Sequence, residues 1–208
     1  MKRIHVAGMI AVMCLGCAGL AHAAEAAAGK PTLENLRAAF NGESNAKVKY
    51  EAFAAKAEEE GYKSVAALFR AASQSEGIHA KKHAAVIAKL GAEPKAEVGR
   101  PDVKGTKENL EAALAGETHE KETMYPEFIK QATAEKNRAA VRTFRSAMLA
   151  EVEHAKLYKQ ALAELDAWKA AGKEFVVCQI CGYTELSSPA LVKCPICSAP
   201  KTKFTVFK

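Results

Sequence analysis

The sequence predicts an all-α four-helix bundle with one long crossover connection, followed by a small β/loop domain that a metal ion holds together. Three observations predict this architecture. Four stretches carry apolar residues at helical spacing, a segment rich in proline and glycine divides them into two pairs, and two Cys-x-x-Cys motifs lie near the C-terminus. Of the 208 residues, 49% are hydrophobic but only 7% are aromatic, which is more typical of helices than of β-sandwiches.

The first 23 residues have the pattern of a secretory signal peptide. Lys2 and Arg3 precede an apolar run over 6–20, and a small-x-small sequence follows at 21–23. A retained membrane anchor is the alternative, but the run is short for a span and has no stop-transfer flank. We therefore expect cleavage after Ala23, no stable membrane anchor, and a soluble periplasmic protein.

The charge of the chain is modest once this segment is set aside. Without Lys2 and Arg3, it carries 28 basic and 24 acidic residues, a net charge of +4. No basic run has aromatic residues interleaved with it, so we expect scattered surface lysines and no nucleic-acid partner.

Four stretches with helical spacing make up the expected bundle domain, 30–171; they cover 32–60, 62–90, 106–134 and 136–171. Short joins within each pair predict two antiparallel hairpins. The segment 91–105 between the pairs spans about 50 Å when extended, against about 45 Å for a helix of thirty residues. It can therefore run the full length of the bundle as a single long crossover.

The two hairpins look like copies of each other. The motif Gly-Glu-Ser at Gly42 recurs as Gly-Glu-Thr at Gly116, an offset of 74, whereas Glu-x-x-His at Glu76 recurs at Glu151, an offset of 75. Two copies packed face to face would place equivalent side chains around a pseudo-twofold axis. Anything that these side chains bind should then lie at the centre of the bundle.

Each expected helix carries a glutamate on its apolar face; the four are Glu43, Glu76, Glu117 and Glu151. An isolated ionised carboxylate in a dry core costs many kcal/mol unless it finds a partner. Four converging carboxylates would also repel one another. A shared multivalent cation resolves both problems, and a salt-bridged polar core is the alternative.

Two of these glutamates begin a Glu-x-x-His motif, which places His79 and His154 one turn away on the same face. Single glutamates from two helices, with Glu-x-x-His from the other two, are the ligand pattern of di-iron carboxylate bundles. Carboxylates with imidazole suit iron or manganese. Glu120, one turn after Glu117, adds a fifth carboxylate that the first copy lacks, so the two metal positions are expected to be unequal.

The motifs around these residues resemble the rubrerythrin family. The stretches that match are GES, EGIH, GETHEKETMYPEF and EVEH, and the resemblance covers essentially the whole chain after the signal. It implies a ferritin-like bundle with a di-iron centre, in which Glu76 and Glu151 bridge the two irons.

The same resemblance implies how the remaining ligands are shared. Glu43 and His154 are expected to complete one iron site. Glu117 is expected to bind the other iron, where Glu120 and His79 exchange as ligands when the redox state changes. Two tyrosines, Tyr50 and Tyr125, are either core residues or hydrogen-bond donors that orient the carboxylates. His83 lies on the same apolar helix face as His79 and is interpreted as structural.

The C-terminal segment, 172–208, is expected to form a domain of its own; its two Cys-x-x-Cys motifs comprise Cys178, Cys181, Cys194 and Cys197. Four thiolates suit a tetrahedral ion, and so short a domain needs the metal to hold its fold. The spacing leaves zinc and iron open. The loops CQICGY and CPICSAPK resemble rubredoxin, which implies iron, although Ser198 stands where that family usually has glycine.

The two expected sites together indicate an oxidoreductase, because a di-iron centre needs electrons delivered singly. As the family resemblance implies, the expected activity is reduction of hydrogen peroxide to water in protection against oxidative stress. Electrons would enter at the iron held by the four cysteines, from an unidentified periplasmic donor. The tail would face a neighbouring subunit's bundle in a homodimer or larger assembly. The alternatives are a ferroxidase that handles iron, and a zinc-stapled helical scaffold without activity.

Overall fold

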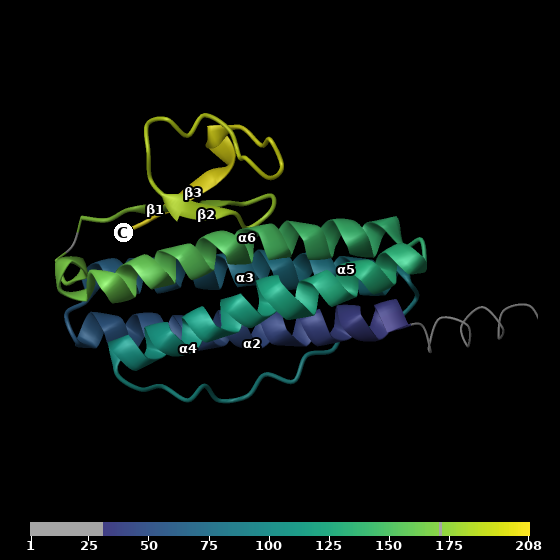
Figure 1. Cartoon of the computed structure of the whole chain (residues 1–208), viewed down its shortest axis with the longest axis horizontal. Coiled ribbons are helices and arrows are strands. Elements are labelled where there is room, and N and C mark those ends of the chain that lie inside the picture. The colour runs from purple at the N-terminus through teal and green to yellow at the C-terminus, as the bar shows by residue number, and fades with distance from the viewer. Residues whose placement is uncertain (1–30, 171) are drawn as a thin grey trace, which may run out of the picture.

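The computed structural model of the chain describes residues 31–170 and 172–208. Within this part, four helical rods form a bundle, and a small sheet domain lies on one side of it (Figure 1). The predicted fold class is therefore confirmed. The expected signal peptide, 1–23, lies outside the described residues.

Helical segments make up the rods of the described bundle; they are α2 (Pro31–Glu59), α3 (Lys63–Lys89), α4 (Thr106–His119) with the π turn η1 (Glu120–Met124) and α5 (Tyr125–Ala134), and α6 (Arg138–Ala163). The hairpin joins are short for local reasons. Gly61, with a φ of 81°, adopts the left-handed conformation that glycine tolerates best. Asn137 caps α6, since its side chain accepts a hydrogen bond from the N–H of Ala140 at 3.1 Å.

The crossover between α3 and α4 runs along the outside of the bundle (Figure 1). Two asparagines of α2 hold it there. The side chain of Asn41 accepts a hydrogen bond from the N–H of Glu97 at 2.8 Å, and that of Asn45 accepts one from the N–H of Gly99 at 3.0 Å. The crossover is thus fixed to the first rod by its own backbone.

The third rod is not a continuous α-helix over 106–134, because η1 interrupts it. A π turn accommodates one residue more than an α turn does. This extra residue explains why the internal repeat has an offset of 74 before η1 and of 75 after it. It is also the turn that begins with Glu120.

The fourth rod is shorter than expected. Helix α6 ends at Ala163 instead of reaching residue 171, and a 3-10 turn, η2 (Leu165–Trp168), follows it. Trp168 is fully buried and packs on Phe175 of the sheet domain, with 5.9 Å between ring centroids. The chain turns here because this ring must reach the sheet domain.

The C-terminal domain is built on three antiparallel strands in the order β2-β1-β3; they are β1 (Phe175–Cys178), β2 (Thr184–Leu186) and β3 (Phe204–Phe207), the last preceded by the 3-10 turn η3 (Lys201–Lys203). Strand β1 lies against α3, and β2 lies against α6. The domain therefore packs directly on the bundle of its own chain, whereas the resemblance had implied that it would face the bundle of a neighbouring subunit.

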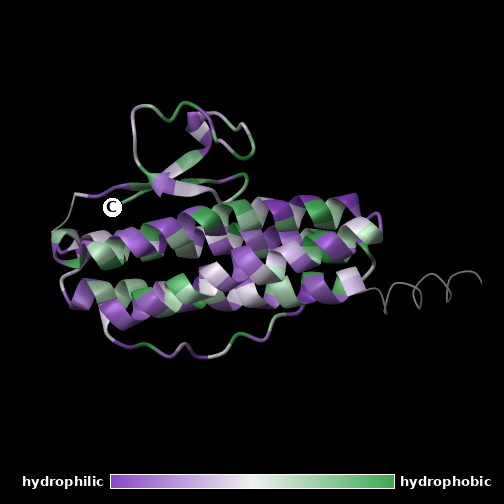
Figure 2. Cartoon of the chain, in the orientation of Figure 1, coloured by the Kyte–Doolittle hydropathy of each residue, from purple (hydrophilic) through white to green (hydrophobic). Residues whose placement is uncertain are grey.

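The bundle core has two apolar parts in the described residues. One includes Phe53 and Leu68, and the other includes Leu36 and Ile87. Each rod contributes residues to both apolar parts of the core. The glutamate that the sequence places on the apolar face of each rod lies between these two groups of residues. Figure 2 shows apolar residues interleaved with polar ones along every rod, as expected when a stripe of each faces inward. Over the described residues, every helix is too short or too polar to cross a membrane.

Candidate metal centres

The structure brings four carboxylates and two imidazoles together in mid-bundle; they belong to Glu43, Glu76, His79, Glu117, Glu151 and His154. None of these side chains is more than 1% exposed. They come from α2, α3, α4 and α6, at the level where the two apolar parts of the core meet. The glutamates that the sequence places on the apolar faces of the helices thus form, with the two histidines, one compact cluster that is buried from solvent.

The cluster divides into two sets of donor atoms. One set comprises Glu43, Glu76, His79 and Glu151, and the other comprises Glu76, Glu117, Glu151 and His154; within each set the donor atoms lie within 4.8 Å of one another. Since Glu76 and Glu151 belong to both sets, their two carboxylates occupy the bridging position between two ion sites.

Distances to the two ring nitrogens define the sets. Nδ1 of His79 lies 3.0 Å from Oε2 of Glu76, 3.0 Å from Oε1 of Glu151 and 3.8 Å from Oε1 of Glu43. Nδ1 of His154 lies 2.8 Å from Oε2 of Glu151 and 3.2 Å from Oε1 of Glu76. It also lies 3.6 Å from Oε1 of Glu117.

This arrangement corrects the expected sharing of the terminal ligands. Glu43 falls with His79, and Glu117 falls with His154, whereas the resemblance had implied the crossed pairs. The reason is the packing of the rods: α2 lies on α3 and α4 lies on α6. Each hairpin therefore supplies both terminal ligands of one site, and only the bridging carboxylates are shared.

The chemistry of the cluster fits a pair of cations. Several buried atoms approach other donor atoms closely but form no hydrogen bond among the described residues, including both oxygens of Glu151, Oε2 of Glu43, Oε2 of Glu117 and Nδ1 of His154. Unpartnered buried carboxylate oxygens are costly unless a cation neutralises them. Burial raises the pKa of Glu43 well above its usual value, and the neighbouring carboxylates of Glu76 and Glu120 raise it further. Oxygen and imidazole donors of this kind suit iron.

Glu120 lies beside the cluster but belongs to neither donor set. It begins the π turn and is partly exposed. Burial raises the pKa of its carboxyl group well above the usual value, and the nearby charges of Glu117 and Glu151 add to this. In this structure the imidazole of His79 completes the donor set that contains Glu43, and not the set that contains Glu117, where the resemblance had implied that Glu120 and His79 exchange.

The two tyrosines donate hydrogen bonds across the internal repeat. The hydroxyl of Tyr50 donates to Oε1 of Glu117 at 2.6 Å, and that of Tyr125 donates to Oε1 of Glu43. Burial raises the pKa of both tyrosines well above the usual value, so both remain protonated donors. Each hairpin thus orients the terminal carboxylate of the other.

His83 supports one of these tyrosines. Its Nε2 lies 3.2 Å from the hydroxyl of Tyr125, and its Nδ1 lies 3.2 Å from Oγ1 of Thr143. Burial lowers the pKa of His83 to about 3, so the ring is neutral. The contact with Tyr125 was not predicted, because sequence spacing does not show which side chain on another rod a seam residue meets.

The four cysteines of the C-terminal domain form a third cluster. All four are free thiols, and their sulfur atoms lie within 4.8 Å of one another. The two loops are alike: the N–H of Gly182 bonds the carbonyl of Cys178, and the N–H of Ser198 bonds that of Cys194, both at 2.9 Å. Gly182 has a φ of 85° and Ser198 a φ of 61°, so serine adopts the left-handed conformation here.

The two metal clusters touch through hydrogen bonds that sequence reasoning missed. Nε2 of His79 lies 3.1 Å from the carbonyl oxygen of Cys181, and Nε2 of His154 lies 3.2 Å from Oγ1 of Thr184. A carbonyl can only accept, so Nε2 of His79 carries the proton and Nδ1 is free to bind a metal. Ser75 also donates to the carbonyl of Gly182 at 2.6 Å.

Comparison with known proteins decides the family. A family model described as rubrerythrin matches residues 34–162, and one described as the rubredoxin-like domain of rubrerythrin matches residues 177–205. The chain belongs to the rubrerythrin family.

Relatives of the rubrerythrin type align over most of the chain. Nigerythrin from Nitratidesulfovibrio vulgaris is 41% identical over 179 residues, which are 85% of this chain and 86% of nigerythrin. Rubrerythrin-2 from Clostridium acetobutylicum is 36% identical over 181 residues, which are 85% of this chain and 96% of that protein. The structure of fully reduced, all-ferrous nigerythrin superposes with a TM-score of 0.79 at 41% identity, covering 84% of this chain and 86% of that one.

Membership of the rubrerythrin family confirms the expected cofactors. The buried carboxylate and imidazole cluster is the di-iron site, and the four cysteines form the rubredoxin-like iron site, whose ion we call the sulfur-ligated iron. A bacterioferritin from Desulfovibrio desulfuricans superposes with a TM-score of 0.63 at 21% identity, over 70% of this chain and 84% of that one, which shows a shared fold alone.

Proposed function

We propose that this protein is a peroxidase that reduces hydrogen peroxide to water in protection against oxidative stress. The overall reaction takes one peroxide, two protons and two electrons, and it releases two waters. The observation that carries the proposal is the contact between the rubredoxin-like domain and the ligands of the di-iron site. An iron-storage protein or a ferroxidase does not require electrons to be delivered to its di-iron site. A one-electron carrier domain packed against the ligands of that site therefore favours a reductase.

The residues of the bundle hold and orient the reacting groups. Bound iron supplies the electrons for cleavage of the O–O bond and Lewis acidity for the departing oxygens. Glu76 and Glu151 belong to both donor sets and would hold the two ions side by side. Tyr50 and Tyr125 restrain the terminal carboxylates through hydrogen bonds, so these ligands need little reorganisation during the reaction.

Protons have to reach the site, because both oxygens of peroxide leave as water. Glu120 suits this role, since it is partly exposed, lies on the π turn and stands outside both donor sets. If Glu120 exchanged with His79 as a ligand, its carboxyl group would move between an outer and an inner position. That movement would carry a proton from the side of the π turn to the cluster.

Electrons have a short route between the two sites. Cys181 binds the sulfur-ligated iron through its Sγ, and its carbonyl accepts a hydrogen bond from His79 at 3.1 Å. The route therefore consists of covalent bonds within Cys181, one hydrogen bond and the imidazole ring. Two successive electrons along this route would restore the di-iron site after each peroxide.

We further propose that the protein is exported by its N-terminal segment and acts in the periplasm. No nicotinamide-binding fingerprint, Gly-x-Gly-x-x-Gly, occurs in the sequence, so the reductant is an external carrier in that compartment. We also propose a homodimer or larger assembly. Sedimentation equilibrium of the secreted protein tests the assembly, and fractionation of expressing cells tests the location.

The experiment that tests the peroxidase proposal supplies the iron-loaded protein with peroxide and a reduced one-electron donor. We expect catalytic consumption of peroxide with two donor molecules oxidised per peroxide. Formation of ferric mineral with no dependence on the donor would instead establish the ferroxidase alternative. A protein that contains zinc in all three metal positions and lacks both activities would be a structural scaffold.

A further inference from the structure

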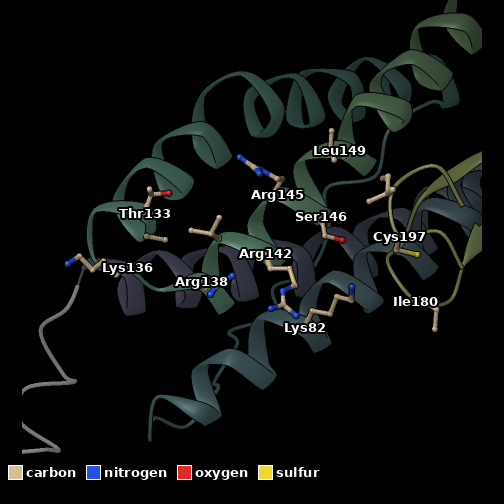
Figure 3. Close-up of a pocket in the computed structure, with 13 residues that line it drawn as sticks. Lys82, Thr133, Lys136, Arg138, Arg142, Arg145, Ser146, Leu149, Ile180 and Cys197 are labelled. Atoms are coloured by element: carbon tan, nitrogen blue, oxygen red, sulfur yellow. The ribbon is translucent and has the colours of Figure 1, made fainter.

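A groove lies where α6 meets the loops of the rubredoxin-like domain. Its volume is about 680 Å³, and Figure 3 shows it between the bundle and the loops that carry Ile180 and Cys197. Five basic side chains line it, and we name it the basic groove after them; they are Lys82, Lys136, Arg138, Arg142 and Arg145. All but Lys82 are exposed.

None of the five cations forms an ion pair within the part of the chain that the structure describes. No aspartate or glutamate lines the groove. Over residues 31–170 and 172–208, the ion pairs of the protein involve other lysines and arginines and none of these five. Like charges gathered in one hollow repel one another, and an anionic partner relieves that repulsion.

The sulfur-bearing end of the groove is apolar and holds an iron ligand. Ile180 is 45% exposed and Leu149 is 41% exposed, and both line the groove together with Cys197. Cys197 is partly exposed, whereas the other three cysteines of the site are buried. An exposed apolar patch around a redox centre, with charge on its rim, is suited to brief protein encounters that depend on steering.

We propose that the basic groove is the docking site for the electron donor, and that this donor is a one-electron carrier protein with an acidic surface. The proposal rests on the proposed function, which requires an external reductant, and it specifies where and by what chemistry that reductant binds. One electron passes from the donor, which is oxidised, to the sulfur-ligated iron, which goes from ferric to ferrous; no bond forms or breaks. Entry beside Cys197 and exit through Cys181 use different ligands of the same iron.

A charge reversal tests the proposal. The double variant Arg138→Glu/Arg142→Glu removes two cations from the groove, and both side chains are exposed, so the fold should tolerate the change. The probe is an acidic flavodoxin in its oxidised form, titrated into the iron-loaded full chain by calorimetry at low ionic strength. We expect the dissociation constant to rise about tenfold or more in the variant, and the affinity of the unaltered protein to fall as salt is added.

A matched control separates the groove from net charge. Lys130→Glu/Lys159→Glu makes the same change in charge at two exposed lysines that do not line the groove. We expect this control to bind flavodoxin within about twofold of the unaltered protein. Equal losses in both double variants, or no loss in either, would overturn the proposal. So would a groove variant that dissociates an oligomer and leaves flavodoxin affinity unchanged, because the groove would then be an interface between copies of this chain.

The binding measurement is independent of peroxide turnover. If flavodoxin binds in the groove and the protein consumes no peroxide with any reductant, the proposed function fails and the docking site stands. If peroxide is consumed with a small-molecule reductant while groove reversal leaves binding unchanged, the function stands and the docking proposal fails.

Discussion

His79 donates a hydrogen bond from Nε2 to the carbonyl oxygen of Cys181 across 3.1 Å. The other nitrogen of the same ring faces the carboxylates of Glu76 and Glu151 at 3.0 Å. One imidazole thus joins a ligand of the sulfur-ligated iron to the ligand shell of the di-iron site. The carbonyl also fixes the tautomer that leaves Nδ1 available for metal.

Gly182 lies in tight contact with this imidazole. A Cβ atom added there would lie 2.3 Å from Nε2 of His79 and 2.7 Å from Oγ of Ser75, and neither ring nor serine can withdraw within the packed interface. We expect Gly182→Ala to push the rubredoxin-like domain away from His79. Electron transfer between the two iron sites, measured by stopped-flow absorbance, should slow by roughly tenfold to a hundredfold.

The control for this variant is Gly61→Ala. Gly61 has a φ of 81°, close to the 85° of Gly182, but nothing lies within 4 Å of an added Cβ. It therefore carries the same backbone strain without the clash, and transfer should keep its normal rate. Equal rates in the two alanine variants would show that the His79 contact does not limit transfer.

Tyr125 orients the carboxylate of Glu43, and Tyr125→Phe removes this donor while leaving the ring in the core. We expect the iron content to remain near two at the bundle site and the rate of peroxide consumption to fall about tenfold. Tyr62→Phe, at a half-buried tyrosine outside the cluster, should leave the rate unchanged. A normal rate in Tyr125→Phe would mean that the tyrosine only fills space.

Ser198 places backbone strain in the rubredoxin-like domain. It has a φ of 61° at the position equivalent to Gly182 in the other loop. Glycine adopts this conformation without a Cβ penalty, so Ser198→Gly should stabilise the domain by about 1 kcal/mol. The measurement is the rate of iron release from the cysteines in a chelator, which should slow. Faster release would mean that the serine side chain contributes more than its backbone costs.

Removal of iron leaves His79 among carboxylates that favour its protonation. Burial alone would lower the pKa of His79, but the carboxylates of Glu151 and Glu76 outweigh it and raise this pKa from 6.5 to about 9. The folded chain then binds the proton more tightly than the unfolded chain. The resulting stability is complete below about pH 6.5 and is lost as the pH rises through about 9.

Urea unfolding of the iron-free protein at about pH 6.5 and at about pH 9 measures this effect. We expect a lower free energy of unfolding at the higher pH, and a smaller difference in the iron-loaded protein, because there the metal takes the place of the proton on Nδ1. A free energy of unfolding that rises with pH in the iron-free protein would contradict the arrangement of charges around His79.

The four glutamates of the cluster were predictable from sequence because a carboxylate on an apolar stripe is conspicuous; they are Glu43, Glu76, Glu117 and Glu151. Their pairing with His79 and His154 was not, since it depends on which rods pack together. The π turn left a trace in the sequence, the shift of the repeat offset from 74 to 75, but a shift alone does not locate or name the turn.

Contacts made by the backbone were beyond sequence reasoning. Every residue has a backbone carbonyl, so the sequence does not indicate that the carbonyl of Cys181 accepts a hydrogen bond from His79. The early end of α6 at Ala163 likewise depends on Trp168 reaching the sheet domain, which is a tertiary requirement that overrides helical spacing. The left-handed Ser198 was foreseeable, because it occupies the place of a glycine in a recognisable loop.

A single-turnover experiment can follow the direction of electron flow between the sulfur-ligated iron and the di-iron site. The protein is fully reduced without oxygen, mixed with one equivalent of hydrogen peroxide, and frozen at intervals for Mössbauer spectroscopy. We predict that the coupled iron pair becomes ferric first and that the sulfur-ligated iron loses its electron afterwards. Oxidation of the sulfur-ligated iron while the pair stays ferrous would show that electrons do not flow from the sulfur-ligated iron to a pair that peroxide has oxidised.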